Sequence, residues 1–273
     1  MSHILEVDNL RLAFGAVEVL HGVSLTIEPG ETLGLVGESG SGKTTIGRAV
    51  LGLVAPSGGR ILIDGIDRGG LNAVERRLLA RKIQVVFQDP YSSLNPAMQI
   101  SDILSEPLIA QGRRSREARA QVADILNRVG LPLDAGQRLP REFSGGQRQR
   151  IAIARALVIE PRLIVCDEPV SALDLSTQAS ILDLLIELQE QTGVAYLFIS
   201  HDLAVVRHIS HRVAVMRRGE IVETGPVRQV TEAPVAPYTK ELLMASPVPD
   251  PRRQKERREA RRRLLDGMPP ITA

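Results

Sequence analysis

Cysteine and aromatic residues are scarce in this sequence. A single cysteine, Cys166, excludes a disulfide framework and any metal or iron–sulfur site built from several cysteines. Cys166 lies inside an apolar run, so we expect a buried structural thiol. Tryptophan is absent and aromatic residues make up only 3% of the chain, so a ring outside an apolar run, such as Phe14, stands out.

Long apolar runs and an excess of charge are also missing. No run approaches the ~20 residues that a membrane-spanning helix needs. Residues 1–6 lack the basic and then apolar pattern of a signal peptide. The formal net charge of +2 is too small to argue for a nucleic-acid partner. We therefore expect a cytosolic protein, peripheral to a membrane only through partner proteins.

A phosphate-binding loop is present, GESGSGKT at residues 37–44. The apolar run before it has strand length, and residues 45–53 after it have a helical pattern. Backbone N–H groups in such a turn form an anion-binding concavity, and the following helix adds the positive end of its dipole. Lys43 supplies a full charge for the β- and γ-phosphates, and the Thr44 hydroxyl is placed to ligate Mg²⁺. A chance match arises in roughly one in a hundred chains of this length. The residues expected to bind nucleotide here are Gly37, Ser39, Gly40, Gly42, Lys43, Thr44 and Thr45.

Strand-like runs alternate with helical patterns along most of the chain. The runs fall within residues 4–36 and at 60–65, 83–87, 162–168, 195–200 and 213–216. This alternation predicts an α/β fold with a mostly parallel sheet covered on both faces. Strand patterns are absent from about 95 to 160, and there one apolar helix face indicates a helical insertion. That face consists of Val122, Ile125, Leu126 and Val129.

Candidate catalytic residues follow the predicted strands. Gly37, Asp167 and His201 each come just after the end of a strand, and ligands of parallel sheets bind at that edge. Asp167 suits a contact with Mg²⁺, and the adjacent Glu168 suits polarisation of an attacking water. Taken alone, the two carboxylates also fit an exposed strand end, and a lone histidine also fits a surface or core position.

The motif FSGGQ at residues 143–147 resembles the signature of ABC ATPases, whose usual first residue is Leu. Further motifs follow the order of that family across residues 4–248. They are Gln88 as the Q-loop, Asp167 and Glu168 as the end of Walker B, SALD at 171–174 as the D-loop, and His201 as the switch histidine. Phe14 stands where the family usually has a Tyr against adenine, although the residue alone leaves stacking and simple packing equally open.

Three segments are similar to the dipeptide, oligopeptide and nickel importer branch of that family. They are VFQDPYSSLNP at 86–96, EFSGGQRQR at 142–150, and the ending from PYT at 237–239 to SPVPDP at 246–251. Ala236 departs from the His that is frequent in the branch. Some relatives carry a C-terminal iron–sulfur cluster, which a single cysteine rules out here.

The resemblance implies a P-loop NTPase core with an N-terminal antiparallel β portion and an inserted α-helical subdomain. We expect residues 1–94 and 161–225 to form the two parts of the ATP-binding core. Residues 95–160 would form the helical subdomain, and 226–273 a C-terminal extension.

Two subunits, identical or paralogous, would sandwich two ATP molecules. The implied contacts to the other subunit's nucleotide come from Ser144, Gly145, Gly146 and Gln147. Gln88, Glu168 and His201 are the implied catalytic residues, and Thr44, Gln88 and Asp167 the implied Mg²⁺ ligands.

Several functions remain open at this point. The leading hypothesis is the ATPase subunit of a peptide-type importer, which drives integral-membrane permeases and is served indirectly by a solute-binding protein. The alternative is an ATP-binding subunit of a carbon–phosphorus lyase assembly. A DNA-repair or chromosome ATPase needs longer coiled-coil or zinc insertions, and a plain P-loop kinase or GTPase leaves the FSGGQ motif unexplained. The transported solute is not encoded in any residue identified here.

The C-terminal segment 252–263 carries eight Arg and Lys residues against Glu256 and Glu259. A solvated helix or a disordered end explains such a charge run, and so does a patch for anionic lipid or nucleic acid.

Overall fold

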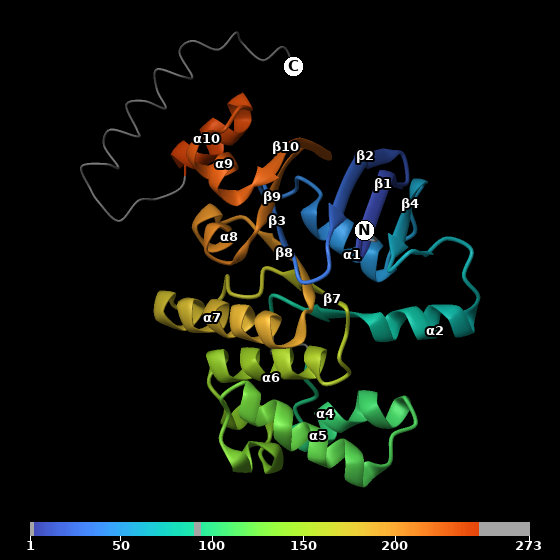
Figure 1. Ribbon diagram of the computed structural model, residues 1–273, viewed down its shortest axis with the longest axis vertical. Helices are drawn as coiled ribbons and strands as arrows, with labels where there is room; N and C mark the ends of the chain where they lie inside the picture. Colours follow the sequence, from blue (N-terminus) through green and yellow to red (C-terminus); the bar gives the residue numbers. More distant parts are fainter. Residues whose placement is uncertain (1–2, 90–93, 246–273) are drawn as a thin grey trace.

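The computed structural model describes residues 3–89 and 94–245. Two β-sheets and most helices occupy one end of the molecule, and helices α4, α5 and α6 form the other end (Figure 1). No helix among the described residues is long and apolar enough to cross a membrane.

The main sheet has six strands in the order β10-β9-β3-β8-β7-β6. They are β3 (Thr32–Val36), β6 (Ile83–Val86), β7 (Leu163–Asp167), β8 (Ala195–Ser200), β9 (Arg212–Arg217) and β10 (Glu220–Pro226). β9, β3, β8, β7 and β6 run parallel to one another, and β10 pairs antiparallel with β9. The expected mostly parallel sheet is therefore confirmed.

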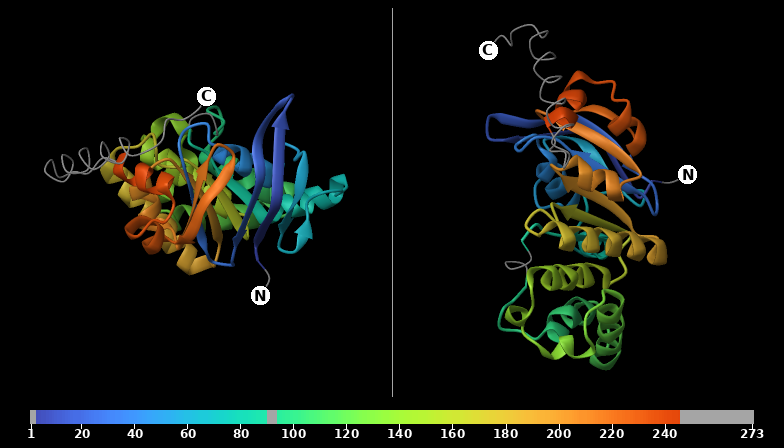
Figure 2. Two further views of the ribbon diagram at one scale, coloured as in Figure 1. Left: turned by 90° about the horizontal axis from the view of Figure 1, so that it is seen from above. Right: turned by 90° about the vertical axis from the view of Figure 1, so that its left-hand side faces the viewer.

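The second sheet is antiparallel, with four strands in the order β2-β1-β4-β5. They are β1 (Leu5–Phe14), β2 (Val17–Ile27), β4 (Gly58–Ile63) and β5 (Ile66–Asp67). Seen from above, this sheet stands beside the main sheet (Figure 2). It is the N-terminal antiparallel β portion that the family resemblance implies.

Eleven helical segments were found in the described ranges. They are α1 (Lys43–Leu51), α2 (Ala73–Lys82), α4 (Ile100–Ala110), α5 (Ser115–Arg128), η1 (Leu133–Gln137), η2 (Pro140–Glu142), α6 (Gly145–Leu157), α7 (Leu175–Thr192), α8 (Leu203–Ile209), α9 (Val227–Glu232) and α10 (Pro237–Ala245).

The main sheet is buried on both faces. Along β8, Tyr196 and Phe198 belong to one apolar cluster, whereas Leu197 and Ile199 belong to another. The first cluster includes residues of α4, α5, α6, α7 and α8, and the second includes α1 and the antiparallel sheet. Because neighbouring side chains of a strand point to opposite faces, continuous apolar runs such as β8 are expected in a sheet covered on both sides.

The stretch between β6 and β7 contains helices and no strand among its described residues. The four residues of the expected apolar face are all buried, three of them in α5 and the fourth, Val129, at its C-cap. Burying each such side chain contributes about 1.5–3 kcal/mol, so this face fixes α5 against its neighbours.

The structure differs from the sequence-based expectations at several element boundaries. The helix after the phosphate loop begins at Lys43 rather than Thr45, and β1 and β2 extend to a hairpin turn at residues 15–16. The sequence pattern predicts no element beyond residue 216, whereas β10, α9 and α10 lie there. The basic segment 252–263 and residues 90–93 of the Q-loop segment lie outside the described residues.

Candidate nucleotide-binding site

Four parallel strands of the main sheet bring the candidate residues to one edge. β3 leads into Gly37, β6 into Gln88, β7 ends at Asp167, and β8 leads into His201. The strand register aligns these ends, because Val36 pairs with Ser200 and Asp167 pairs with Ile199. The structure thus places the predicted residues at one edge, as their positions after the strands indicate.

The phosphate loop is packed closely against the rest of the sheet. A Cβ atom added to Gly37 would lie 2.1 Å from the carbonyl oxygen of Met216, at the end of β9, so only glycine fits this position. Ser39 and Gly40 lie exposed at the tip of the loop, whereas Thr45 is half-buried in α1. Gly42 precedes α1 without a side-chain cap, so the N–H groups of the first helical turn can receive an anion.

Lys43 folds back onto the loop. Its Nζ atom donates to the carbonyl oxygens of Gly37 and Glu38, each at 2.8 Å. The side chain is buried, and burial lowers the pKa of Lys43, against the raising effect of the nearby carboxylates. An ammonium group has three N–H donors, and the third makes only a long contact of 3.5 Å with the Ser41 hydroxyl, so it can turn to a phosphate oxygen.

Thr44 and Asp167 form the part of the site suited to a metal ion. The Thr44 hydroxyl donates to Asp167 Oδ1 at 3.1 Å. Burial raises the pKa of Asp167, although the hydrogen bond from Thr44 acts in the opposite direction. A desolvated carboxylate beside a hydroxyl is a donor set that fits Mg²⁺, which takes one or two carboxylates and completes its shell with water and phosphate oxygens.

The described residues contain no group of three or more His, Cys, Asp or Glu side chains that could hold a metal by itself. A Mg²⁺ ion held here therefore needs the phosphates of a nucleotide as further ligands. Gln88, the third expected metal ligand, is exposed two residues beyond β6. Thr44 and Asp167 bond to each other, and the role of Gln88 as a third metal ligand stays a prediction.

Glu168 and His201 face each other across the ends of β7 and β8. His201 Nδ1 lies 3.0 Å from Glu168 Oε1. The backbone of Glu168 has a φ of 50°, in the left-handed region, which costs about 1–3 kcal/mol for a residue other than glycine. Hydrogen bonds from the N–H and hydroxyl of Ser171 to the Glu168 carbonyl support this conformation. The chain thus tolerates a strained residue where a carboxylate is presented beside the loop.

The FSGGQ motif forms the start of α6. The Ser144 hydroxyl accepts from the N–H of Gln147, and the Gln147 side chain accepts from the N–H of Ser144, which together make a capping box. A Cβ added to Gly146 would lie 2.5 Å from Thr177 Cγ2, so α6 packs directly on α7. Phe143 is buried, so an apolar side chain suits this position, as the usual Leu does.

The structure does not bring this motif to the phosphate loop of its own chain. No hydrogen bond links Ser144, Gly145, Gly146 or Gln147 to residues 37–45 within the described part of the chain. The two groups of helix-start N–H donors therefore remain separate in one subunit.

Phe14 lies at the end of β1, where 52% of its surface is exposed. The ring is not part of the core, which weakens simple packing as its explanation.

Sequence-based reasoning missed Tyr238 altogether as a site residue: its hydroxyl accepts the N–H of Glu38 in the phosphate loop at 3.2 Å. The scarcity of aromatic residues is the signal that draws attention to this tyrosine.

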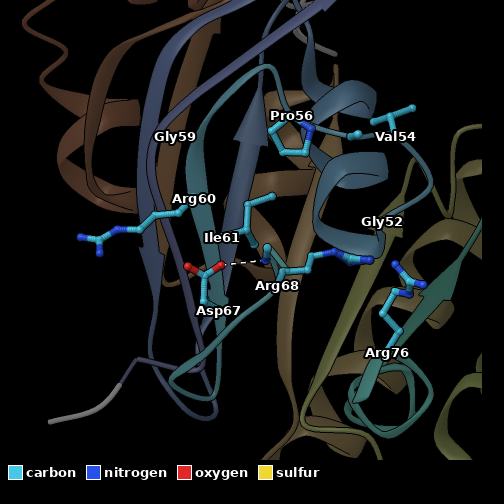
Figure 3. Close-up of a pocket in the computed structure, with 11 residues that line it drawn as sticks. Gly52, Val54, Pro56, Gly59, Arg60, Ile61, Asp67, Arg68 and Arg76 are labelled. Carbon is cyan, nitrogen blue, oxygen red and sulfur yellow. Dashed lines mark hydrogen bonds between the residues drawn. The ribbon is translucent and has the colours of Figure 1, made fainter. Parts of the chain in front are cut away.

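A pocket of about 380 Å³ lies at the opposite end of α1 from the phosphate loop (Figure 3). Arg68, the residue after β5, and Arg76 of α2 line it. Arg68 Nη1 donates to the carbonyl oxygen of Val50 at 2.8 Å, so this guanidinium caps the C-terminus of α1. Burial lowers the pKa of Arg68, and the positive charge of Arg76 lowers it further.

Comparison with known proteins agrees with this geometry. A family model described as ABC transporter matches residues 20–171. The oligopeptide transport ATP-binding protein OppD of Mycobacterium tuberculosis is 52% identical over 245 residues, which are 90% of this chain and 40% of OppD. The glutathione import ATP-binding protein GsiA of Escherichia coli K12 is 54% identical over 254 residues, 93% of this chain and 40% of GsiA. A probable peptide ABC transporter ATP-binding protein, y4tS of Sinorhizobium fredii, is 52% identical over 240 residues, 88% of this chain and 68% of y4tS. The chain thus spans about 40% of the length of its OppD and GsiA relatives.

Solved structures with the same fold are also ATP-binding cassettes. CbiO1 of Clostridium perfringens, part of the ABC transporter complex cbiONQ, has a TM-score of 0.79 at 27% identity, over 97% of this chain and 100% of that one. The dimeric cassette MJ0796 bound to ADP and Pi has a TM-score of 0.73 at 31% identity, over 82% of this chain and 99% of that one. The fold is that of an ABC-type P-loop NTPase. By sequence and by structure, this chain belongs to the ABC transporter family of ATP-binding proteins.

Proposed function

We propose that this protein is the ATP-hydrolysing subunit of an importer for peptides or similar small solutes. The observation that carries the proposal is the convergence of four features at one edge of the main sheet. They are the phosphate loop, Lys43, the Thr44–Asp167 pair and the Glu168–His201 pair. Phosphoryl transfer needs positioning, charge neutralisation and an activated nucleophile, and these features supply them.

The residues divide the work in the following way. The N–H groups at the start of α1 and Lys43 bind the outer phosphates of ATP. Thr44 and Asp167 would hold Mg²⁺, which when bound neutralises charge developing on the phosphates. Glu168 accepts a proton from the attacking water, and His201 holds the Glu168 carboxylate in place from 3.0 Å away. Gln88, at the junction of the sheet and the helical segment, responds to the bound nucleotide, and Phe14 stacks on the adenine.

A second ATPase subunit, identical or paralogous, completes each site. The start of α6 offers helix-start N–H groups and small residues suited to a phosphate, with the N–H of Gln147 taken by the Ser144 cap, yet it is not joined to the phosphate loop of its own chain. We infer that it faces the nucleotide of the partner subunit. The dimeric MJ0796 cassette bound to ADP and Pi supports this arrangement by analogy. Residues 95–160 then act as a helical subdomain that moves against the two parts of the core.

The importer hypothesis also requires integral-membrane permeases as partners. An apolar groove of about 370 Å³, which shares Arg68 and Arg76 with the pocket of Figure 3, suits a cytoplasmic permease loop, and Phe87, next to Gln88, lines it. Leu53 and Phe87, which line it, are 62% and 39% exposed. A solute-binding protein would act only through the permeases, and the subunit would lie at the cytoplasmic face of the membrane. The names of the relatives favour peptide transport over the carbon–phosphorus lyase alternative.

The proposal is tested by measuring phosphate release from ATP and Mg²⁺ over a range of protein concentrations. Because each site needs two subunits, we expect the rate per subunit to rise with concentration and then level off. Lys43→Ala is the matched control and should lose the activity. Hydrolysis that is absent in the wild-type protein alone and with co-expressed permeases would refute the proposal.

A further inference from the structure

The peptide unit between Gly37 and Glu38 is held on both sides. Its carbonyl oxygen, on Gly37, accepts from Lys43 Nζ at 2.8 Å. Its N–H, on Glu38, donates to the hydroxyl of Tyr238 at 3.2 Å, across 200 residues of sequence. A peptide unit is planar, so its C=O and N–H cannot turn independently. The contact with Tyr238 therefore fixes the direction of the carbonyl that holds the lysine.

Tyr238 is itself held firmly. Only 4% of the residue is exposed, and the guanidinium of Arg217 lies 4.7 Å from the centre of its ring. The start of α10 is anchored by the Glu223 carboxylate, which accepts from the N–H groups of Val235 and Ala236 at 2.8 and 3.1 Å. The hydroxyl is thus presented to the loop by a ring that cannot move away without unpacking α10.

The same region of the chain supports the back of the loop. The N–H of Gly219, in the turn between β9 and β10, donates to the carbonyl oxygen of Ser41 at 3.0 Å. Arg217, which lies over the Tyr238 ring, is the last residue of β9. The turn after β9 and helix α10 thus each donate to or accept from the backbone of the phosphate loop.

We propose that Tyr238 is a positioning residue for the phosphate loop, whose hydroxyl orients the Gly37–Glu38 peptide and through it the ammonium group of Lys43. This inference rests on the proposed function, because it assumes that ATP binds at the loop. With the hydroxyl in place, two donors of Lys43 are held on loop carbonyls, and the third, 3.5 Å from the Ser41 hydroxyl, is available to a phosphate.

Without the hydroxyl, the Glu38 N–H loses its acceptor, and the bond from Lys43 to the Gly37 carbonyl is left as the restraint on this peptide. Lys43 must then be ordered when the nucleotide arrives, and such ordering weakens binding. Tyr238→Phe keeps the ring, its burial and the Arg217 contact. We expect it to raise the Kd for ATP by about 3- to 10-fold, the range for one neutral hydrogen bond.

The experiment is an equilibrium titration of the full chain with a fluorescent ATP analogue and Mg²⁺. Tyr196→Phe is the matched control, because Tyr196 is also buried and its hydroxyl donates to the carbonyl of Leu185, at 3.1 Å, within the core. Both variants should melt at a lower temperature, but only Tyr238→Phe should raise the Kd. Lys43→Ala reports whether binding takes place at the loop.

Each result decides one question. If Tyr238→Phe binds like the wild type while Lys43→Ala does not bind, the positioning role is wrong and the proposed function stands. If both Tyr→Phe variants weaken binding equally, the effect is general destabilisation and the positioning role is again wrong. If wild-type binding is absent or does not depend on Lys43, the proposed function fails and this inference falls with it.

Discussion

His201 Nδ1 and Glu168 Oε1 lie 3.0 Å apart across the ends of two neighbouring parallel strands. The histidine side chain is 55% exposed, whereas the glutamate side chain is 20% exposed. A mostly solvated ring therefore reaches toward a mostly covered carboxylate. This pairing fixes the direction of the carboxylate that we propose as the base in hydrolysis.

Glu168→Gln should bind ATP as the wild type does and hydrolyse it about 10²- to 10⁴-fold more slowly, because an amide cannot accept the proton of the attacking water. Asp167 remains to hold the metal. Single-turnover phosphate release and equilibrium binding, measured on the same preparation, test the two halves of this expectation. Wild-type turnover in the variant would show that another group is the base.

Asp167→Asn should raise the melting temperature at neutral pH when Mg²⁺ is absent. Burial raises the pKa of Asp167, so the folded state holds the proton more tightly than the unfolded state does. The resulting stabilisation is complete below the ordinary pKa of 3.8 and is lost as the pH rises through the raised folded value. The advantage of Asp167→Asn should therefore shrink as the pH falls toward 3.8.

The control for this measurement is Asp124→Asn, a change on the exposed face of α5 that should leave the melting temperature unaltered. In the presence of ATP, Asp167→Asn should also lose the extra stabilisation that Mg²⁺ gives the wild type. A variant that melts below the wild type at neutral pH would contradict the assigned cost of burying this charge.

Gly145→Asp should leave ATP binding to the monomer nearly intact and abolish ATP-driven dimerisation and hydrolysis. Its carboxylate would lie where the phosphate of a partner's nucleotide must approach, and like charges repel strongly in a poorly solvated gap. Sedimentation with ATP reports the dimer, and phosphate release reports turnover. The idea of a shared site fails if this change weakens monomer binding as much as Lys43→Ala does.

A mixture of two single variants separates the roles further. When one subunit carries Lys43→Ala and the other Gly145→Asp, one composite site has both lesions and the other has neither. The mixture should therefore form more ATP-bound dimer than Gly145→Asp alone. An equal lack of dimer in both samples would argue against the composite site.

Arg68→Met should lower the free energy of unfolding by about 1–2 kcal/mol, because the charged hydrogen bond to the Val50 carbonyl is lost while the apolar stem is kept. Arg76→Met, in the same pocket, removes a like charge and should change stability by less than about 0.5 kcal/mol. Urea denaturation of both variants tests whether Arg68 acts as a helix cap. Equal effects would show that it does not.

Much of the core of this fold is predictable from local sequence patterns. The strand at 195–200 and the helix over residues 45–53 follow from an apolar run and a helical pattern, and the structure has β8 and α1 there. The edge of the sheet that carries Asp167 and His201 also follows, because the residues after parallel strands share one edge.

The C-terminal elements are harder to predict for physical reasons. Helix α9 has six residues and buries only Val230, so no periodic apolar face can be recognised. The bond between Tyr238 and Glu38 depends on how α10 packs against a loop 200 residues earlier, which no local pattern encodes. Likewise, the left-handed backbone of Glu168 is set by its neighbours and not by its side chain.

The burial of Cys166 has a practical consequence. This thiol is the single one in the chain, lies fully covered on β7 between β8 and β6, and has a pKa that burial raises. A thiol reagent can therefore reach it only when β7 separates from its neighbours, so the labelling rate of the unaltered protein measures the opening of its central sheet. The same protection leaves the surface available for engineered cysteines, which can carry spectroscopic labels without a background signal from the native thiol.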